Sequence, residues 1–172
     1  MATLTDPVGH IILTGFMGVG KTTIGRRVAD FVQRRFIDTD EVITVRAGMP
    51  IPQLFAQFGE PHFRQLERDL VTELVSQQRL VIATGGGMLV DEGNRALFAK
   101  SGFVICLDAP PDLIEDRLRS SSDRPLAANW RELFEKRQAA YAAIPLHLSV
   151  VGKSADQSAQ EIIRLWRTST SM

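Results

Sequence analysis

The chain has 172 residues, of which 20 are basic and 20 acidic, so its net charge at neutral pH is zero. A chain of this length usually forms one domain, and a balanced charge argues against nonspecific binding to nucleic acid or to an anionic membrane surface. No apolar run approaches the ~20 residues that cross a bilayer, and the first ten residues lack the apolar segment of a secretory signal. The single cysteine, Cys106, has no partner for an internal disulfide. We expect one cytoplasmic domain over residues 1–172 that binds neither nucleic acid nor membrane.

Short apolar runs alternate with amphipathic segments along the chain. In order, they predict a strand at 10–14, a helix at about 21–33, a strand at 36–37, two short helical segments separated near Gly48 and Pro50, and a helix after Pro61. They then predict strands at 80–83 and 103–107, a helix at about 111–119, a mobile polar loop at 120–125, a helix at 130–143, a strand at 146–150 and a closing helix at 155–167. This alternation favours an α/β fold in three layers, with a central five-stranded parallel sheet and helices on both faces.

One motif carries most of the functional information. Residues 15–22, GFMGVGKT, match G-x-x-x-x-G-K-[ST] at every fixed position and lie between a predicted strand and a predicted helix. Glycines let backbone N–H groups approach phosphate oxygens, and the helix N-terminus adds the positive end of its dipole. The Lys21 ammonium then suits the β- and γ-phosphates, and the Thr22 hydroxyl suits Mg²⁺. The motif predicts ATP and Mg²⁺ as cofactors, with ATP held by Gly18, Val19, Gly20, Lys21, Thr22 and Thr23; the alternative is a glycine-rich turn with a chance lysine.

The rest of the chain narrows the class of nucleotide-binding protein. It lacks the N-K-x-D motif with which switch GTPases read guanine, and no predicted strand ends in the consecutive acids of ATPase motors. A small kinase that closes over ATP and a small acceptor remains.

Further motifs resemble those of the shikimate kinases, a branch of the nucleoside-monophosphate-kinase group of P-loop folds. Beyond the phosphate loop, the shared features are Asp38 and Asp40, segment 59–64 with Glu67, segment 84–87, segment 124–126, Arg137 and Tyr141. The resemblance covers nearly the whole chain. It implies a P-loop NTPase fold with a helical substrate-binding insertion at about 38–68 and a mobile lid at about 119–130. The activity it implies is ATP-dependent phosphorylation of the 3-hydroxyl of shikimate, in aromatic amino-acid biosynthesis, by an enzyme that we expect to be monomeric.

Two acids follow the second predicted strand. Asp38 and Asp40 lie at the carboxyl end of a parallel strand, where open α/β sheets bind ligands, and they point the same way if strand geometry persists through them. The resemblance implies that Asp38, with Thr22, faces the metal and that Asp40 binds the hydroxyls of the acceptor and orients or deprotonates the attacking oxygen. The alternative is a helix N-cap at Thr39 or Asp40.

Two arginines suit a carboxylic acid as acceptor, because guanidinium groups bind carboxylates in planar, bidentate geometry. The resemblance places Arg64 and Arg137 on the substrate carboxylate, with Glu67 orienting Arg64 and the backbone of Gly86 and Gly87 contacting the substrate. The alternatives are solvated surface arginines, an ordinary charge on a helix face for Glu67, and a merely flexible glycine loop.

The remaining candidates surround the nucleotide. Arg124, in the predicted lid, is expected to stabilise the charge on the transferred phosphoryl group, as a catalytic residue with Lys21 and Asp40. Arg119 is expected to stack on adenine with Lys153 beside it. A solvated loop charge is the alternative for Arg124, and the weakly distinctive segment 151–155 leaves the adenine contacts open.

Two rival functions stay open. A gluconate-type or nucleotide-type small kinase would share the phosphate loop, and a non-catalytic regulatory module would bind nucleotide without turnover. The three histidines, at positions 10, 62 and 147, show no spacing typical of metal ligands and are interpreted as structural or exposed. Trp130, Trp166 and Cys106 are interpreted as core residues.

Overall fold

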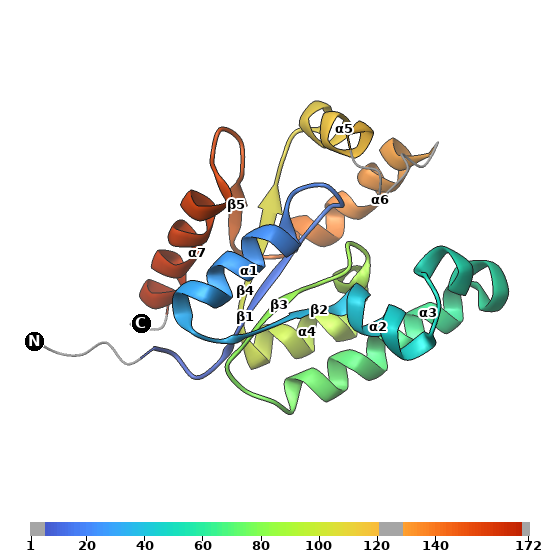
Figure 1. The fold of residues 1–172 in the computed structure, drawn as a ribbon, viewed down its shortest axis with the longest axis horizontal. Coiled ribbons are helices and arrows are strands. Elements are labelled where there is room, and N and C mark those ends of the chain that lie inside the picture. The colour runs from blue at the N-terminus through green and yellow to red at the C-terminus, as the bar shows by residue number, and fades with distance from the viewer. Residues whose placement is uncertain (1–5, 121–128, 170–172) are drawn as a thin grey trace, which may run out of the picture.

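A five-stranded parallel sheet forms the centre of the molecule in a computed structural model that describes residues 6–120 and 129–169 (Figure 1). Its strands lie in the order β2-β3-β1-β4-β5. They are β1 (His10–Gly15), β2 (Arg35–Asp38), β3 (Leu80–Ala83), β4 (Gly102–Asp108) and β5 (His147–Ser149). This sheet confirms the predicted fold class, and the order places β1 between two later strands.

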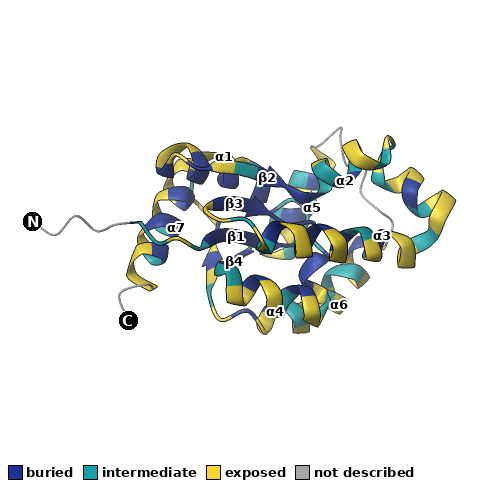
Figure 2. Ribbon diagram, turned by 90° about the horizontal axis from the view of Figure 1, so that it is seen from below, coloured by how far each residue is buried: buried dark blue, intermediate teal, exposed yellow. Residues whose placement is uncertain are grey.

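Helices cover both faces of the sheet (Figures 1 and 2). On one side α1 packs against α7, and on the other α3 packs against α4. The helices are α1 (Lys21–Val32), α2 (Thr39–Ala47), α3 (Ile51–Val75), α4 (Glu92–Ser101), α5 (Pro111–Arg119), α6 (Trp130–Ala142) and α7 (Ala155–Ser169), with a 3-10 turn, η1, at Met88–Val90.

Two stretches differ from the predicted elements. Residues 88–101 form η1 and α4, although the apolar pattern predicts no element there. The pattern is weak because α4 buries only Asn94 and Phe98, which is too narrow a stripe to indicate an amphipathic helix. The helix predicted after Pro61 begins earlier, at Ile51, and includes a non-helical residue, Gly59, with φ 78° and ψ 168°. A kink therefore stands where a break between two helices was expected.

The core lies on both sides of the central strands, which explains their uninterrupted apolar sequence. Ile11, Ile12 and Leu13 of β1 are fully buried, and so is Cys106 of β4. Trp130 and Trp166 are buried as predicted. Within the described ranges, no helix combines the length and the apolar character needed to span a membrane.

Candidate active site

The phosphate loop connects β1 to α1. At Gly15, φ is 134°, and a Cβ there would lie 2.5 Å from the carbonyl oxygen of Leu107 in β4, so only glycine fits. Gly20, at φ 100°, precedes the first residue of α1. The buried Lys21 ammonium donates to the carbonyl oxygens of Gly15 (2.8 Å) and Phe16 (2.9 Å), and it therefore lies folded over the loop.

Asp38 joins this loop to β2. The hydroxyl of Thr22 donates to Oδ2 of Asp38 at 2.6 Å. Oδ1 of Asp38 accepts the backbone N–H groups of Asp40 (3.0 Å) and Glu41 (3.3 Å), so Asp38 is the N-cap of α2. The alternative interpretation, a cap at Thr39 or Asp40, is wrong by one or two residues. Strand geometry also ends at Asp38, because α2 begins at Thr39 and Asp40 lies in its first turn.

A cavity of about 200 Å³ connects the loop to the acid pair. Its lining combines residues of four separate chain segments: Gly18, Gly20, Lys21, Thr22, Thr23, Asp38, Asp40, Thr84, Arg117 and Leu118. Backbone donors, a buried ammonium and two carboxylates thus share one space, which is the set of groups that a magnesium–triphosphate needs.

Three side chains converge on the glycine loop after β3. A Cβ on Gly87 would lie 2.7 Å from Nη1 of Arg64 and 3.1 Å from Nη2 of Arg137, and one on Gly85 would lie 2.4 Å from Oδ1 of Asp40. The two arginines come from α3 and α6, so their meeting is a result of the tertiary fold. A larger residue at 85 or 87 would occupy the space that these charged groups use.

The glycine loop also adjoins the phosphate loop. A Cβ on Gly86 would lie 3.6 Å from the carbonyl oxygen of Gly15 and 3.7 Å from the backbone nitrogen of Met17. The hydroxyl of Tyr141 donates to the carbonyl oxygen of Gly86 at 2.6 Å and holds this segment against α6. Burial raises the pKa of Tyr141 to about 12, so the hydroxyl remains a donor at neutral pH.

Two carboxylates hold Arg64. Its Nη1 donates to Oε2 of Glu67 at 2.7 Å and its Nη2 to Oε1 of Glu60 at 3.0 Å. Burial lowers the pKa of Arg64, but the hydrogen bonds and charges of Glu67 and Glu60 outweigh burial and leave that pKa raised.

Glu67 is a buried partner, not an ordinary charge on a helix face. Its side chain is only 1% exposed, and burial raises its pKa although the Arg64 guanidinium acts in the opposite direction. Both members of the pair thus show raised pKa values, because the carboxylate is desolvated more completely than the guanidinium. The other carboxylate oxygen, Oε1, makes no hydrogen bond with the described part of the chain.

Arg117, which is not among the site residues predicted from the sequence, lies at the phosphate loop. Its Nη1 donates to the carbonyl oxygens of Gly18 and Val19, each at 3.1 Å. Arg119 instead pairs with Glu115 and keeps 67% of its side chain exposed. The sequence does contain a signal for the position of Arg117, because helical spacing places it next to the buried residues Ile114 and Leu118 of α5.

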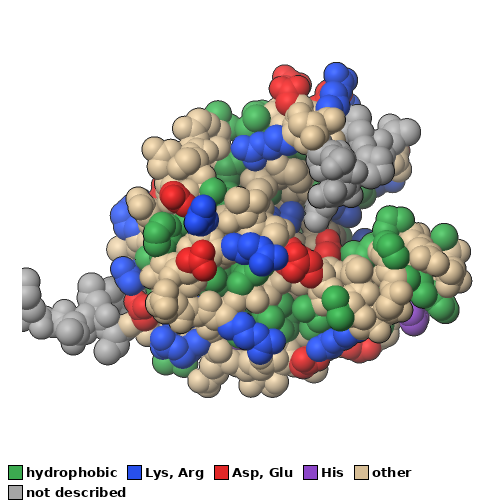
Figure 3. All heavy atoms as spheres, viewed as in Figure 1, with side chains coloured by type: hydrophobic (Ala, Val, Ile, Leu, Met, Phe, Trp, Pro, Cys, Tyr) green, Lys and Arg blue, Asp and Glu red, His purple; other side chains and the backbone are tan. Residues whose placement is uncertain are grey.

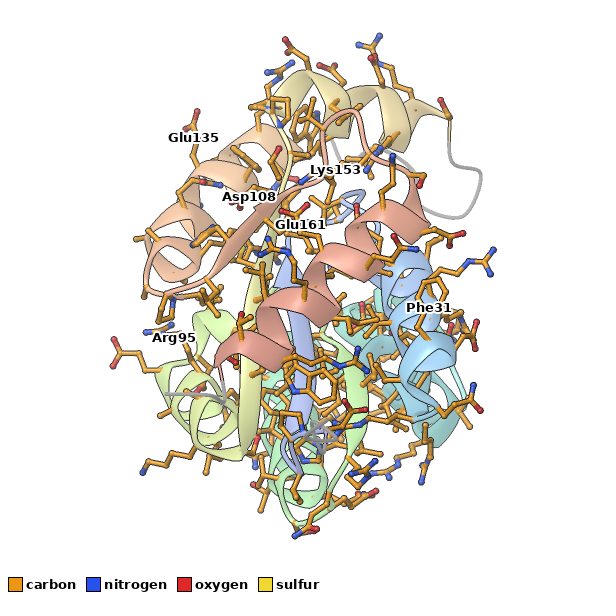
Figure 4. All side chains as sticks on the ribbon, turned by 90° about the vertical axis from the view of Figure 1, so that its left-hand side faces the viewer. Phe31, Arg95, Asp108, Glu135, Lys153 and Glu161 are labelled. Carbon is orange, nitrogen blue, oxygen red and sulfur yellow. The ribbon has the colours of Figure 1, made fainter. Side chains whose placement is uncertain are left out.

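Lys153 lies beside the phosphate loop as well. It lines a second cavity of about 270 Å³ together with Gly20, Arg117 and Ser158. Its ammonium pairs with Glu161 of α7 at 2.7 Å, and Figure 4 shows the two side chains close together. Arg124 lies outside the described residues.

A family model described as shikimate kinase matches residues 17–167. The chain belongs to the shikimate kinase family. A shikimate kinase of Caldanaerobacter subterraneus is 38% identical over 163 residues, which cover 91% of this chain and 95% of that protein. The solved structure of a shikimate kinase from Acinetobacter baumannii in complex with shikimate superposes with a TM-score of 0.88 and 32% identity, over 97% of each chain.

Membership in this family makes the chain an enzyme, a kinase that phosphorylates shikimate in aromatic biosynthesis with ATP as the phosphoryl donor. A gluconokinase from Sinorhizobium meliloti superposes with a TM-score of 0.63 but is only 14% identical, so that likeness shows the fold alone. The rival gluconate-type function therefore has no support beyond a shared architecture.

Proposed function

We propose that this chain transfers the γ-phosphoryl group of ATP to the 3-hydroxyl of shikimate in the cytoplasm, using the residues gathered at the carboxyl edge of the sheet. The observation that carries the proposal is the convergence of Arg64 and Arg137 over Gly87, next to Asp40 and against the phosphate loop. An acceptor held there by its carboxylate has its ring between two arginines and an acid, with one hydroxyl facing the nucleotide.

The nucleotide half of the site is formed by the backbone of residues 18–23 together with Lys21. Backbone N–H groups and the N-terminus of α1 bind the phosphates, and Lys21 exchanges its two carbonyl partners for phosphate oxygens. Arg117 supports the loop through the carbonyls of Gly18 and Val19, and Lys153 lies beside the loop near the region where we expect the base.

Thr22 and Asp38 suit Mg²⁺. Their hydroxyl and carboxylate oxygens are 2.6 Å apart, and oxygen atoms of these two kinds are the ligands that Mg²⁺ prefers. When bound, the ion would neutralise the charge that develops between the β- and γ-phosphates. Asp38 is pre-oriented for this role because the backbone N–H groups of α2 hold its other oxygen.

On the acceptor side, Arg64 and Arg137 bind the carboxylate, and Glu67 positions Arg64. Asp40 accepts the proton of the attacking hydroxyl or orients that hydroxyl in line with the γ-phosphorus. The bare backbone of Gly86 and Gly87 lets the ring lie close to the loop. Arg124 would add a positive charge at the transferred group, and Arg119, exposed at the end of α5, would reach adenine only by leaving Glu115.

The acceptor is tested in a coupled assay of ADP release with shikimate, gluconate and AMP offered separately. We expect kcat/KM for shikimate to be at least ~100-fold above the values for gluconate and AMP. An acceptor without a carboxylate in reach of Arg64 and Arg137 loses two charge-assisted hydrogen bonds, of about 1.5–3 kcal/mol each. Preference for gluconate or AMP would overturn the proposal, and binding of shikimate and ATP without turnover would support the regulatory module instead.

The arginine fork is tested with Arg64→Ala. We expect kcat/KM for shikimate to fall by about 100-fold or more, while the Kd of a non-hydrolysable ATP analogue stays within a few-fold. Arg68→Ala is the matched control, because Arg68 lies one turn further along α3 and its guanidinium makes exposed contacts, an ion pair with Asp91 and hydrogen bonds to Gln65. If nucleotide affinity collapsed and shikimate binding survived, the role assigned to Arg64 would be wrong.

A further inference from the structure

A second group of side chains with metal-binding chemistry lies at the ends of β4 and β5. Cys106 and Asp108 are two residues apart in β4 and so point to the same face of the sheet. His147 of β5 is the direct neighbour of Cys106 in the parallel register. Strand pairing alone therefore places a thiol, a carboxylate and an imidazole together, although Cys106 and His147 are far apart in the sequence.

The distances suit a shared ion. Sγ of Cys106 lies 3.6 Å from Oδ1 of Asp108, and Nδ1 of His147 lies 2.7 Å from Oδ2 of the same carboxylate. One ligand atom from each residue falls within 4.8 Å of the other two. Ligands placed about 2.0–2.3 Å from a tetrahedral zinc ion are separated by only a little more than 3 Å, so small side-chain rotations close the set.

We propose that Cys106, Asp108 and His147 form a binding site for a divalent transition metal of the zinc class, separate from the Mg²⁺ of the reaction. The donor set decides the class, because a thiolate and an imidazole select zinc-like ions, whereas Thr22 and Asp38 offer only the oxygen atoms that Mg²⁺ takes.

The site has an entrance and room for a fourth ligand. Asp108 and His147 line a cavity of about 240 Å³ together with Phe16, Gln138 and Tyr141. The His147 side chain is 35% exposed and that of Asp108 is 48% exposed. Asp108, at the end of β4, lies next to β5 (Figure 4). Water entering this cavity can complete a tetrahedron around an ion that Cys106 holds from the buried side.

Charge and protonation are consistent with the site. A thiolate and a carboxylate neutralise a dication when the imidazole is neutral. Burial and the neighbouring Asp108 raise the pKa of the Cys106 thiol to about 12, so the thiol is protonated until a metal displaces its proton to solvent. Metal binding therefore releases the thiol proton to solvent, and His147 can bind an ion through Nδ1 only as the tautomer that carries its proton on Nε2.

Such an ion would bind the two strands together. β5 is a three-residue strand at the edge of the sheet, and it pairs only with β4 among the described strands. A metal bridging Cys106 and Asp108 of β4 to His147 of β5 adds a link that the unfolded chain lacks, and it stabilises the fold by mass action.

Titration of the nucleotide-free protein with Co²⁺, followed by competition with Zn²⁺, tests the proposal. We expect one equivalent of Co²⁺ to give a thiolate-to-cobalt charge-transfer absorption, which can arise only from Cys106 because the chain has one cysteine. At 100-fold excess over Kd, Zn²⁺ should raise Tm by about 5 °C or more.

The variants separate this site from others. Cys106→Ser should abolish the absorption, and His147→Gln should weaken binding at least tenfold. His62→Gln is the control, because His62 lies in a different pocket, between α2 and α3, and should leave binding unchanged. Stoichiometric Co²⁺ without the thiolate absorption, or unchanged affinity in His147→Gln, would overturn the proposal. The second result stands even if Cys106→Ser fails to fold.

Discussion

Asp38 holds two neighbours at once through its two carboxylate oxygens. One caps α2, and the other accepts from Thr22 of the phosphate loop. A single side chain thus fixes where the helix of the acid pair begins and how far the proposed Mg²⁺ ligands stand from each other.

Asp38→Asn separates these two functions. Asparagine caps helices as well as aspartate, so we expect Tm to change by no more than about 2–4 °C, the shift that 1 kcal/mol produces in a chain of this size. The amide lacks the negative charge that Mg²⁺ requires, so the Mg²⁺ concentration for half-maximal activity should rise at least tenfold. An unchanged Mg²⁺ dependence would contradict the assignment of Asp38 to the metal.

His10, the first residue of β1, makes the stability of the fold depend on pH. It is buried in β1, and its Nδ1 accepts the backbone N–H of Leu80 at 3.2 Å. Burial lowers its pKa below the ordinary 6.5, and the charge of Arg34 acts in the same direction. The folded protein therefore resists protonation that the unfolded chain accepts.

Stability should accordingly be complete above about pH 6.5 and should decline as the pH falls from there toward the lowered pKa. Below both values the loss stays constant. Thermal unfolding at pH 7.5 and 5.5 measures the effect, and His10→Gln should reduce the difference in Tm between the two. His62→Gln, which changes an exposed histidine, should keep the difference; equal pH dependence in all three proteins would refute the role of His10.

At the scale of elements, the kink in α3 decides where Arg64 points. Gly59 adopts φ 78° and ψ 168°, a region open almost exclusively to glycine, and Arg64 follows just over one helical turn later. α3 packs against α2, and the part of α3 after the kink carries Arg64 and Glu67 toward the glycine loop.

Gly59→Ala should cost about 1–3 kcal/mol, because the alanine must either hold a strained backbone or straighten the helix. For a chain of this size that lowers Tm by roughly 3–10 °C. Reorientation of Arg64 should also raise KM for shikimate several-fold. Gln57→Ala, an exposed change in the same helix, should leave both values nearly unchanged. A fully active and stable Gly59→Ala would contradict this account.

At the scale of the whole molecule, strand order brings the site together. β1 lies between β3 and β4, with β2 beyond β3, so the carboxyl ends of β1, β2 and β3 meet at the same edge of the sheet. The phosphate loop follows β1, the acid pair lies at the junction of β2 and α2, and the three glycines follow β3. Ligands bind at such switch points because the connections diverge there and leave a crevice.

We propose that the protein is a monomer. Acidic and basic side chains are interspersed on the face shown in Figure 3. Among the described residues, the large apolar side chains that are exposed belong to different parts of the chain, namely Val8, Phe31, Val45, Phe58, Val90, Leu97 and Val151. Sedimentation should show one species of 19.1 kDa at micromolar concentrations, and a concentration-independent dimer would refute the monomer.

Short stretches of sequence are enough to predict the strands and the phosphate loop of this protein. Apolar runs predict the five strands, most clearly β1 and β3, in which every residue is buried. The phosphate loop can be recognised because its glycines, lysine and threonine stand at fixed spacings within one short segment. The candidate residues Asp40, Arg64, Gly87 and Arg137 were also named from motifs, and their convergence is a feature of the folded chain.

Only the tertiary structure decided the rest. The sequence favoured Arg119 over Arg117, yet the rotation of α5 puts Arg117 at the loop. The N-cap at Asp38 depends on where β2 ends, and the weakly patterned α4 depends on packing against α3. Cys106 meets His147 only because β4 and β5 pair in one register. Local sequence patterns reflect interactions between residues that are close in the chain. The contacts above depend instead on strand order and helix rotation, which the packing of the whole core determines.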